Sequence, residues 1–227
     1  VELSDTTVSE EVDFSRVLSA SDVDIVTNGQ TLSYTVSSSN PDLVTVDTSN
    51  TDNQGGGQLD LDLQLNQNGS ALITVIVSDS ETPSMSDTTS FTLIVDPVND
   101  APTISNITDQ STNEGTAKTG IAFTVDEGGG ADEDAETLTV TATSSNTTLV
   151  PNANIIVNYT DNGSSSASAL SPTLDITPVG DFNGTTTITV TVTDNGTGNL
   201  TATDTFVLTV DPVNDAPTIS NITDQST

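Results

Sequence analysis

The chain has 227 residues, of which 33 are acidic and only two are basic, and its formal net charge at pH 7 is −31. Because almost nothing on it can neutralise phosphate, we expect it to bind neither nucleic acid nor an anionic membrane, and to attract cations instead. Cysteine and tryptophan are absent and aromatic residues make up 3%. Disulfides and soft-metal sites are therefore excluded, the core must be thin, and no apolar run is long enough for membrane insertion.

Short segments in which apolar and polar residues alternate recur along the chain and predict β-strands. In chain order the clearest lie at residues 31–40 (TLSYTVSSSN), 71–77 (ALITVIV), 137–146 (TLTVTATSSN), 186–192 (TTITVTV) and 205–210 (TFVLTV). Such β-branched, Thr-rich runs are typical of half-buried strands, and Asn-Gly turn dipeptides lie between them. No segment shows a 3.6-residue apolar period. The pattern predicts an all-β fold of β-sandwiches.

A duplication sets the domain organisation. Residues 95–112 and 210–227 are identical at an offset of 115, which is about the length of one domain and indicates a tandem array. We predict a first sandwich at 1–95, a linker at 96–102 and a second sandwich at 103–210. Residues 211–227 are then expected to be a second linker with the opening strand of a third repeat. A low-complexity stretch at 160–171 is expected to be a longer surface loop of the second repeat.

Acidic residues gather in the linkers and at the ends of predicted strands. Hard divalent cations such as Ca²⁺ take six to eight oxygen ligands, and carboxylates crowded without a cation repel one another. These clusters are therefore candidate metal sites. They comprise Asp96, Asn99 and Asp100; Asp211, Asn214 and Asp215; Asp22 and Asp24; Asp126, Glu127, Asp132, Asp134 and Glu136; Glu10 and Glu114; and Asp79 and Asp194.

A simpler interpretation applies to some of the same residues. An acidic loop such as 126–136 also keeps a secreted protein soluble without binding anything. Asp60 and Asp62 alternate with Leu in LDLDL and are interpreted as the polar face of a strand. Glu81 and Asp87 are likewise interpreted as solvated loop residues. The prolines at 97, 102, 212 and 217 are expected to stiffen the linkers.

The order and spacing of several motifs resemble a known family. Residues 22–34 contain Asp-X-Asp-X-X-X-Asn-Gly followed by Tyr34, residues 113–115 are Asn-Glu-Gly, and 181–194 are DFNGTTTITVTVTD. Together with DEGGGADEDAETLTV at 126–140 and Asp-X-X-Asn-Asp-Ala-Pro in each linker, they resemble cadherin repeats. They are most similar to the cadherin-like and immunoglobulin-like tandem repeats of large bacterial surface proteins. The resemblance implies Ig-like/cadherin-like Greek-key β-sandwiches joined end to end, with Ca²⁺ bound where repeats meet.

Carried onto this chain, the resemblance implies three sets of Ca²⁺ ligands. The complete joint would draw on Glu10, Asp96, Asn99, Asp100, Asp132, Asp134 and Asp194. A preceding repeat would be faced by Asp22, Asp24 and Asp79, and the joint to a third repeat would use Glu114, Asp211, Asn214 and Asp215. The family places a further acid before the penultimate strand; the second repeat has Asp181 there, whereas the first has Asn66.

The leading functional hypothesis is a non-catalytic, calcium-rigidified extracellular segment that acts as stalk or spacer of a cell-surface adhesin. Its partners are then neighbouring repeats, and the sequence names no distal receptor. A self-assembling fibre subunit is one alternative. A glycan- or protein-binding module is another, disfavoured by the scarcity of aromatic residues. An enzyme is not expected, because without His or Cys only acid pairs in linkers and loops remain.

Overall fold

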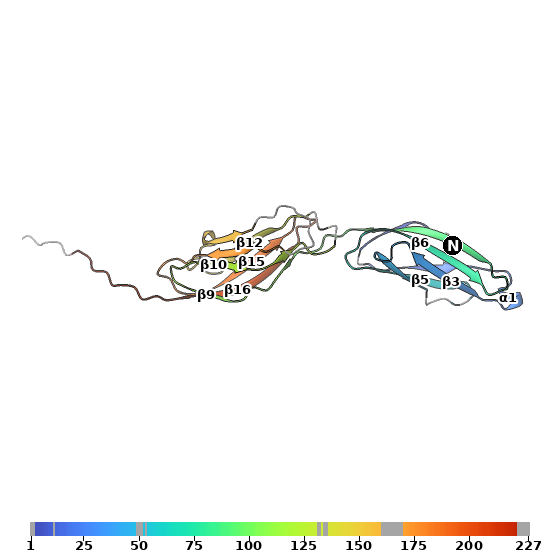
Figure 1. The fold of residues 1–227 in the computed structure, drawn as a ribbon, viewed down its shortest axis with the longest axis horizontal. Coiled ribbons are helices and arrows are strands. Elements are labelled where there is room, and N and C mark those ends of the chain that lie inside the picture. Colours follow the sequence, from blue (N-terminus) through green and yellow to red (C-terminus); the bar gives the residue numbers. More distant parts are fainter. Residues whose placement is uncertain are drawn as a thin grey trace, which may run out of the picture. The chain divides into compact units, whose positions relative to one another are not determined.

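The computed structural model describes residues 3–10, 12–48, 52, 54–130, 133, 136–159 and 170–221. The chain divides into two compact units. Unit 1 is Val1–Asp100 with Gly129–Glu133, and unit 2 is Ala101–Gly128 with Asp134–Thr227. Figure 1 shows that each unit is built almost wholly of strands. The finer boundaries at 96 and 102 stay predictions.

In its described residues, unit 1 is a sandwich of seven strands with one short helix. Strands β1, β7, β6 and β3 form one sheet in that order, and β2, β5 and β4 form the other. β1 runs parallel to β7, whereas the other pairs are antiparallel. The elements are β1 (Thr6–Ser9), β2 (Phe14–Ser19), α1 (Ile25–Asn28), β3 (Leu32–Ser38), β4 (Val44–Asp47), β5 (Gly56–Leu63), β6 (Gly69–Asp79) and β7 (Ser86–Asp96).

Unit 2 repeats this topology. Its four-stranded sheet has the order β9, β16, β15, β12, its three-stranded sheet the order β10, β14, β13, and β8 pairs with β11 alone. β9 again runs parallel to the last strand, β16. The elements are β8 (Thr103–Ile104), β9 (Gln110–Asn113), β10 (Lys118–Ala122), β11 (Val125–Asp126), β12 (Thr139–Ser144), the 3₁₀ helix η2 (Asn152–Asn154), β13 (Ile155–Asn158), β14 (Thr173–Ile176), β15 (Gly184–Thr193) and β16 (Thr201–Asp211).

The all-β sandwich fold expected from the sequence is confirmed, with one difference. The one-turn helix α1 follows the Asp22–Asp24 turn and ends at Gly29, whose φ of 69° is left-handed. A single turn is too short to produce an apolar period, so the pattern could not reveal it. Neither α1 nor any other helix in the described part of the chain is long and apolar enough to span a bilayer. Most of the predicted 160–171 loop lies outside the described residues.

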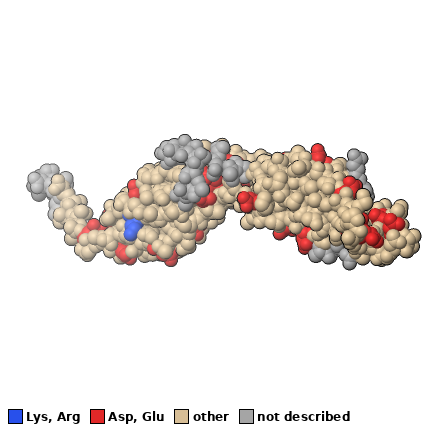
Figure 2. All heavy atoms as spheres, turned by 45° about the vertical axis from the view of Figure 1, so that its right-hand side comes forward, with Lys and Arg blue, Asp and Glu red and all other residues tan. Residues whose placement is uncertain are grey.

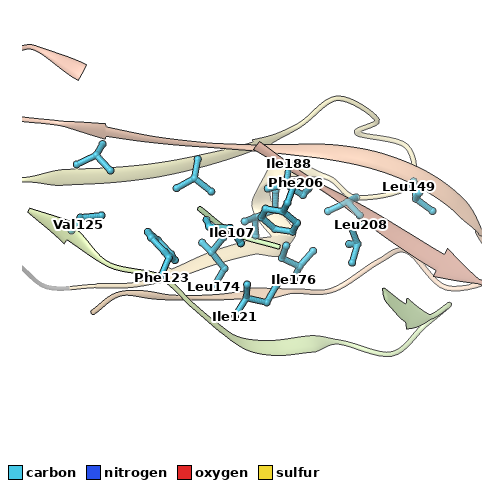
Figure 3. Packing of buried hydrophobic residues seen from close by; sticks show 14 of the residues in the cluster. Ile107, Ile121, Phe123, Val125, Leu149, Leu174, Ile176, Ile188, Phe206 and Leu208 are labelled. Atoms are coloured by element: carbon cyan, nitrogen blue, oxygen red, sulfur yellow. The ribbon is translucent and has the colours of Figure 1, made fainter. Parts of the chain in front are cut away.

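Each sandwich holds its own core of aliphatic side chains packed around buried phenylalanine, Phe91 in unit 1 and Phe123 and Phe206 in unit 2. In unit 2, Phe206 packs with Ile188, Leu208 and Ile176 between the two sheets (Figure 3). In unit 1, Phe91 takes the corresponding place in a cluster drawn from both sheets. The strand alternation explains this placement, because every second residue of a strand faces the same side. Burial of each such side chain stabilises the fold by about 1.5–3 kcal/mol.

The exposed edge of each last strand carries an acidic cap. β1 pairs only with the end of β7, and directly before that pairing the Thr92 N–H donates to Asp5 Oδ1 at 2.7 Å. In unit 2 the Val207 N–H donates to Asp109 Oδ1 at 2.8 Å, directly before β9 begins to pair with β16. An unpaired edge N–H is a template for pairing with another chain, so these carboxylates protect the edge.

A close backbone approach closes one end of unit 1. The Gly55 carbonyl accepts hydrogen bonds from the Ala20 N–H at 2.7 Å and the Tyr34 hydroxyl at 2.6 Å. Burial and the charge of nearby Asp52 raise the pKa of Tyr34, so its hydroxyl keeps the proton that it donates. Gly55 has φ of 100°, and a Cβ there would lie 2.1 Å from the Ala20 carbonyl oxygen.

We therefore expect Gly55→Ala to destabilise unit 1 by more than the roughly 1–3 kcal/mol of backbone strain alone, because the clash is with main chain. Gly69→Ala is the matched control, since Gly69 has φ of 126° but nothing within 4 Å of a built Cβ. Denaturant unfolding, with amide exchange in unit 1 as the readout, measures the free energy of unfolding of both variants. Equal losses of stability in the two variants would show that the close approach of Gly55 to Ala20 adds no cost of its own.

Candidate cation-binding ends of the two units

A groove of about 550 Å³ at one end of unit 1 gathers acidic side chains from two loops. Asp22 and Asp24 come from the turn before α1, and Asp79, Glu81 and Asp87 come from the β6–β7 hairpin. Figure 2 shows this concentration of acidic side chains at the end of unit 1 that carries α1. The remaining polar lining includes Asn28 and Gln30. Oxygen atoms of this kind are the ligands of hard cations.

Local hydrogen bonds hold the turn before α1 in shape. The Asp24 N–H donates to Asp22 Oδ1 at 2.8 Å, which is the side-chain turn that Asp favours. The Asn28 N–H donates to the Asp24 carbonyl at 2.9 Å, and Gly29 then reverses the chain. The turn backbone therefore holds the Asp22 carboxylate, and the Thr27 hydroxyl donates to Asp24 Oδ1 at 3.3 Å.

Asp79 organises the hairpin on the other side of the groove. Its Oδ1 accepts hydrogen bonds from the Glu81 and Met85 N–H groups, each at 3.1 Å. Asp194 of unit 2 does the same, accepting from Gly196 at 3.1 Å and Leu200 at 2.9 Å. Asp194 is buried, whereas Asp79 is half-buried. In both predicted ligands, Asp79 and Asp194, Oδ1 thus holds the hairpin that follows.

Gln30 also lines the groove, and it is buried there. It is 6% exposed, and its side-chain Nε2 is buried without a hydrogen-bond partner. A buried amide left unsatisfied costs about 1–3 kcal/mol. The same amide also carries an oxygen, which is a ligand type of hard cations, and Gln30 is among the residues that line the groove.

The opposite end of each unit carries one of the predicted glutamates. Glu10 is buried, and its Oε1 accepts the Val98 N–H at 2.6 Å. Glu114 is half-buried, and its Oε1 accepts the Val213 N–H at the same distance. Asp96 and Asp211 contribute main-chain carbonyls that accept from the two glutamate N–H groups at 3.0 and 2.9 Å.

Asp100 has a close acidic neighbour within unit 1. Its N–H donates to Glu133 Oε1 at 3.3 Å, and Glu133 is 3% exposed. Gly129 lies against both residues: a Cβ there would be 2.8 Å from Asp100 Oδ2 and 2.5 Å from Glu133 Cγ. Glycine at position 129 is therefore needed for a close approach, beyond simple loop flexibility.

The structure brings some of the predicted ligands together and leaves others apart. Asp22, Asp24 and Asp79 share the groove. Among the described residues, no three acidic side chains stand close enough to hold one ion. Asp96, Asp211, Asn214 and Asp215 are exposed, and Asn99 is half-buried. Asp132 and Asp134 lie outside the described residues.

Several residues of these ends were not predicted from the sequence. Glu81 and Asp87 were interpreted as solvated loop residues, yet both line the groove. Their position on the hairpin that follows Asp79 was the available signal. Glu133 lies between the two acids that were chosen, and only its burial distinguishes it. Gln30 gives no sequence signal, because Gln is common on exposed turns.

Comparisons with known proteins find distant structural similarities only. No protein-family model matches the chain, and no curated protein matches it. Among solved structures it is similar to protocadherin gamma C5 EC1-3, with 19% identity, a TM-score of 0.47, and coverage of 91% of this chain and 66% of that one. For protocadherin gamma B7 extracellular cadherin domains 1-4 the values are 18%, 0.43, 94% and 50%.

A similarity of the same grade extends to an endo-fucoidan hydrolase of glycoside hydrolase family 107, with 20% identity, a TM-score of 0.32 and coverage of 94% of this chain and 28% of that one. The chain thus spans less than two thirds of each of these proteins. At such identities and scores these similarities assign no activity or ligand to the chain.

Substitutions of Asp79 separate its hairpin role from any role of its charge. Asp79→Ala removes the acceptor of two N–H groups, so we expect faster amide exchange at Glu81 and Met85. In chelator, the free energy of unfolding should fall by roughly 1–3 kcal/mol. Asp79→Asn keeps Oδ1 and should retain most of that protection. Hydrogen exchange followed by NMR measures both, and equal loss in the two variants would contradict this assignment.

Proposed function

We propose that this chain is a non-catalytic segment of an extracellular, adhesion-type repeat protein, in which Ca²⁺ bound at the acidic ends of its β-sandwich repeats stiffens a stalk or spacer. The observation that carries the proposal is the groove of unit 1. Five carboxylate side chains from two loops line it, beside Asn28 and Gln30. Arg16, the single basic residue of unit 1, is not among the residues that line this groove.

The donor chemistry of the groove fits a hard cation. Asp22 and Asp79 each use Oδ1 for the backbone, which leaves Oδ2 for a ligand. Gln30 would add the neutral oxygen of its side-chain amide. A bound Ca²⁺ supplies two positive charges that offset the repulsion between the carboxylates. Small rotations of the acidic side chains are required, because as they stand no three described acids converge on one point.

The sequence supports the same use of the linkers. Asp96, Asn99 and Asp100 recur as Asp211, Asn214 and Asp215 in an identical setting. The motif resemblance implies that the first linker set binds Ca²⁺ together with Glu10, Asp132, Asp134 and Asp194, and the second set together with Glu114. Extracellular modules of this type bind Ca²⁺ at about 10⁻⁴–10⁻³ M, which matches calcium outside a cell.

Thermal unfolding of the chain in a few millimolar Ca²⁺, in Mg²⁺ and in chelator tests calcium binding. A ligand at a hundredfold excess over its Kd stabilises the folded state by about 2.7 kcal/mol, so we expect the transition of unit 1 to rise by several degrees in Ca²⁺. Asp22→Asn with Asp24→Asn should abolish this rise. Asp60→Asn with Asp62→Asn is the matched control on a sheet face and should keep it.

Stiffening is a separate consequence and has its own measurement. Small-angle scattering should give a larger maximum dimension in Ca²⁺ than in chelator. Equal dimensions in the two conditions would leave calcium binding intact but remove its mechanical role. No thermal shift in any unit would reduce the acidic ends to solvated surface.

Gln30→Met gives a sharper test of the groove. Replacing an unsatisfied buried amide with an apolar side chain of similar shape removes its desolvation penalty, so we expect equal or greater stability in chelator. The same change should reduce the Ca²⁺-induced shift, because an oxygen ligand is lost. A variant that is less stable in chelator and shifts as the wild type does would contradict the role of Gln30.

A further inference from the structure

The last strand of each unit runs directly into an Asp-Pro-Val sequence that interrupts main-chain pairing. In unit 1 the parallel ladder of β1 and β7 ends with Ser9 opposite Asp96, and the Glu10 N–H then donates to the Asp96 carbonyl at 3.0 Å. The next residue is Pro97, which has no N–H to donate. The ladder therefore cannot continue through the main chain.

The glutamate side chain continues the pairing beyond the proline. Glu10 Oε1 accepts the N–H of Val98, the first donor after Pro97, at 2.6 Å. This hydrogen bond is short and its acceptor is a carboxyl oxygen of a buried side chain. The first three residues of the linker are thus attached to unit 1 at two points, one from the backbone and one from the side chain of the same residue.

The same arrangement of glutamate, proline and valine recurs in unit 2. Asn113 lies opposite Asp211 at the end of the β9–β16 ladder, and the Glu114 N–H donates to the Asp211 carbonyl at 2.9 Å. Pro212 follows, and the Val213 N–H donates to Glu114 Oε1 at 2.6 Å. Glu114 Oε2 also accepts from Asn183 Nδ2 at 3.4 Å. Because this geometry occurs in both units, we regard it as a feature of the repeat.

We propose that Glu10 and Glu114 are positioning residues that fasten the start of each linker to the repeat before it, without any cation. The direction in which the chain leaves a repeat is then set inside that repeat. Beyond these attachment points the linkers continue through residues 99–102 and 214–217, which contain the predicted ligands Asn99, Asp100, Asn214 and Asp215. The consequence for a stiffened array rests on the proposed function, whereas the fastening itself does not.

Amide exchange and ¹⁵N relaxation of the whole chain in chelator test this proposal. In the wild type, the amide of Val213 should exchange at least about tenfold more slowly than that of Asn214, since a hydrogen bond to a charged acceptor gives roughly tenfold to hundredfold protection. Glu114→Ala should abolish that protection and increase the mobility of residues 212–217. Glu114→Gln retains an acceptor oxygen of the same reach and should restore most of it.

Asp175→Ala is the matched control within unit 2. Asp175 Oδ1 accepts the Gly120 N–H at 2.8 Å, so its loss should expose Gly120 and leave Val213 protected. Unchanged Gly120 protection in Glu114→Ala shows that unit 2 is still folded. Wild-type exchange at Val213 as fast as at Asn214, or no rescue by Gln, would overturn the proposal. Because chelator is present throughout, this result is independent of whether Ca²⁺ shifts the melting temperature.

Discussion

The accommodation of many carboxylates with almost no basic partners is the constraint that shapes this chain. With 33 acidic residues and two basic ones, ion pairs cannot neutralise them, and the backbone supplies the hydrogen-bond donors instead. Asp5 and Asp109 cap edge N–H groups, Asp79 and Asp194 hold hairpins, and the two glutamates hold linkers. Each of these bonds uses one carboxylate oxygen and fixes the direction of the other, so the ends of the sandwiches are both ordered and strongly negative.

The two units serve as an internal comparison that separates shared architecture from local variation. The carboxylate–amide bonds at the strand edges, hairpins and linkers occur in both. By contrast, unit 2 buries a hydroxyl pair, Ser144 Oγ and Thr186 Oγ1 at 2.7 Å, where unit 1 has the apolar Ala71 at the position matching Thr186. The core thus tolerates a change of chemistry. The carboxylate–amide bonds, in contrast, keep the same chemistry in both units.

Much of the fold was predictable, and the site was predictable only in part. Period-two runs such as residues 186–192 determine which face of a strand is buried, so the sandwiches follow from the sequence. The pattern could not show that Glu133 is buried beside Asp100, because that depends on how a glycine-rich loop closes. Nor could it show that Glu10 bypasses Pro97, since the two lie far apart in the chain. Contacts between distant segments carry no local signal.

The identity of residues 101–112 and 216–227 poses a problem of partner choice, since either segment could in principle pair with β16. Neighbouring repeats of similar sequence misassemble most readily when equivalent segments compete during folding. A ribosome makes the chain from its amino end, so 110–113 is already present when β16 emerges, and the second copy appears only afterwards. Unit 2 is thereby completed with the earlier segment. The order of synthesis resolves an ambiguity that the sequence itself leaves open.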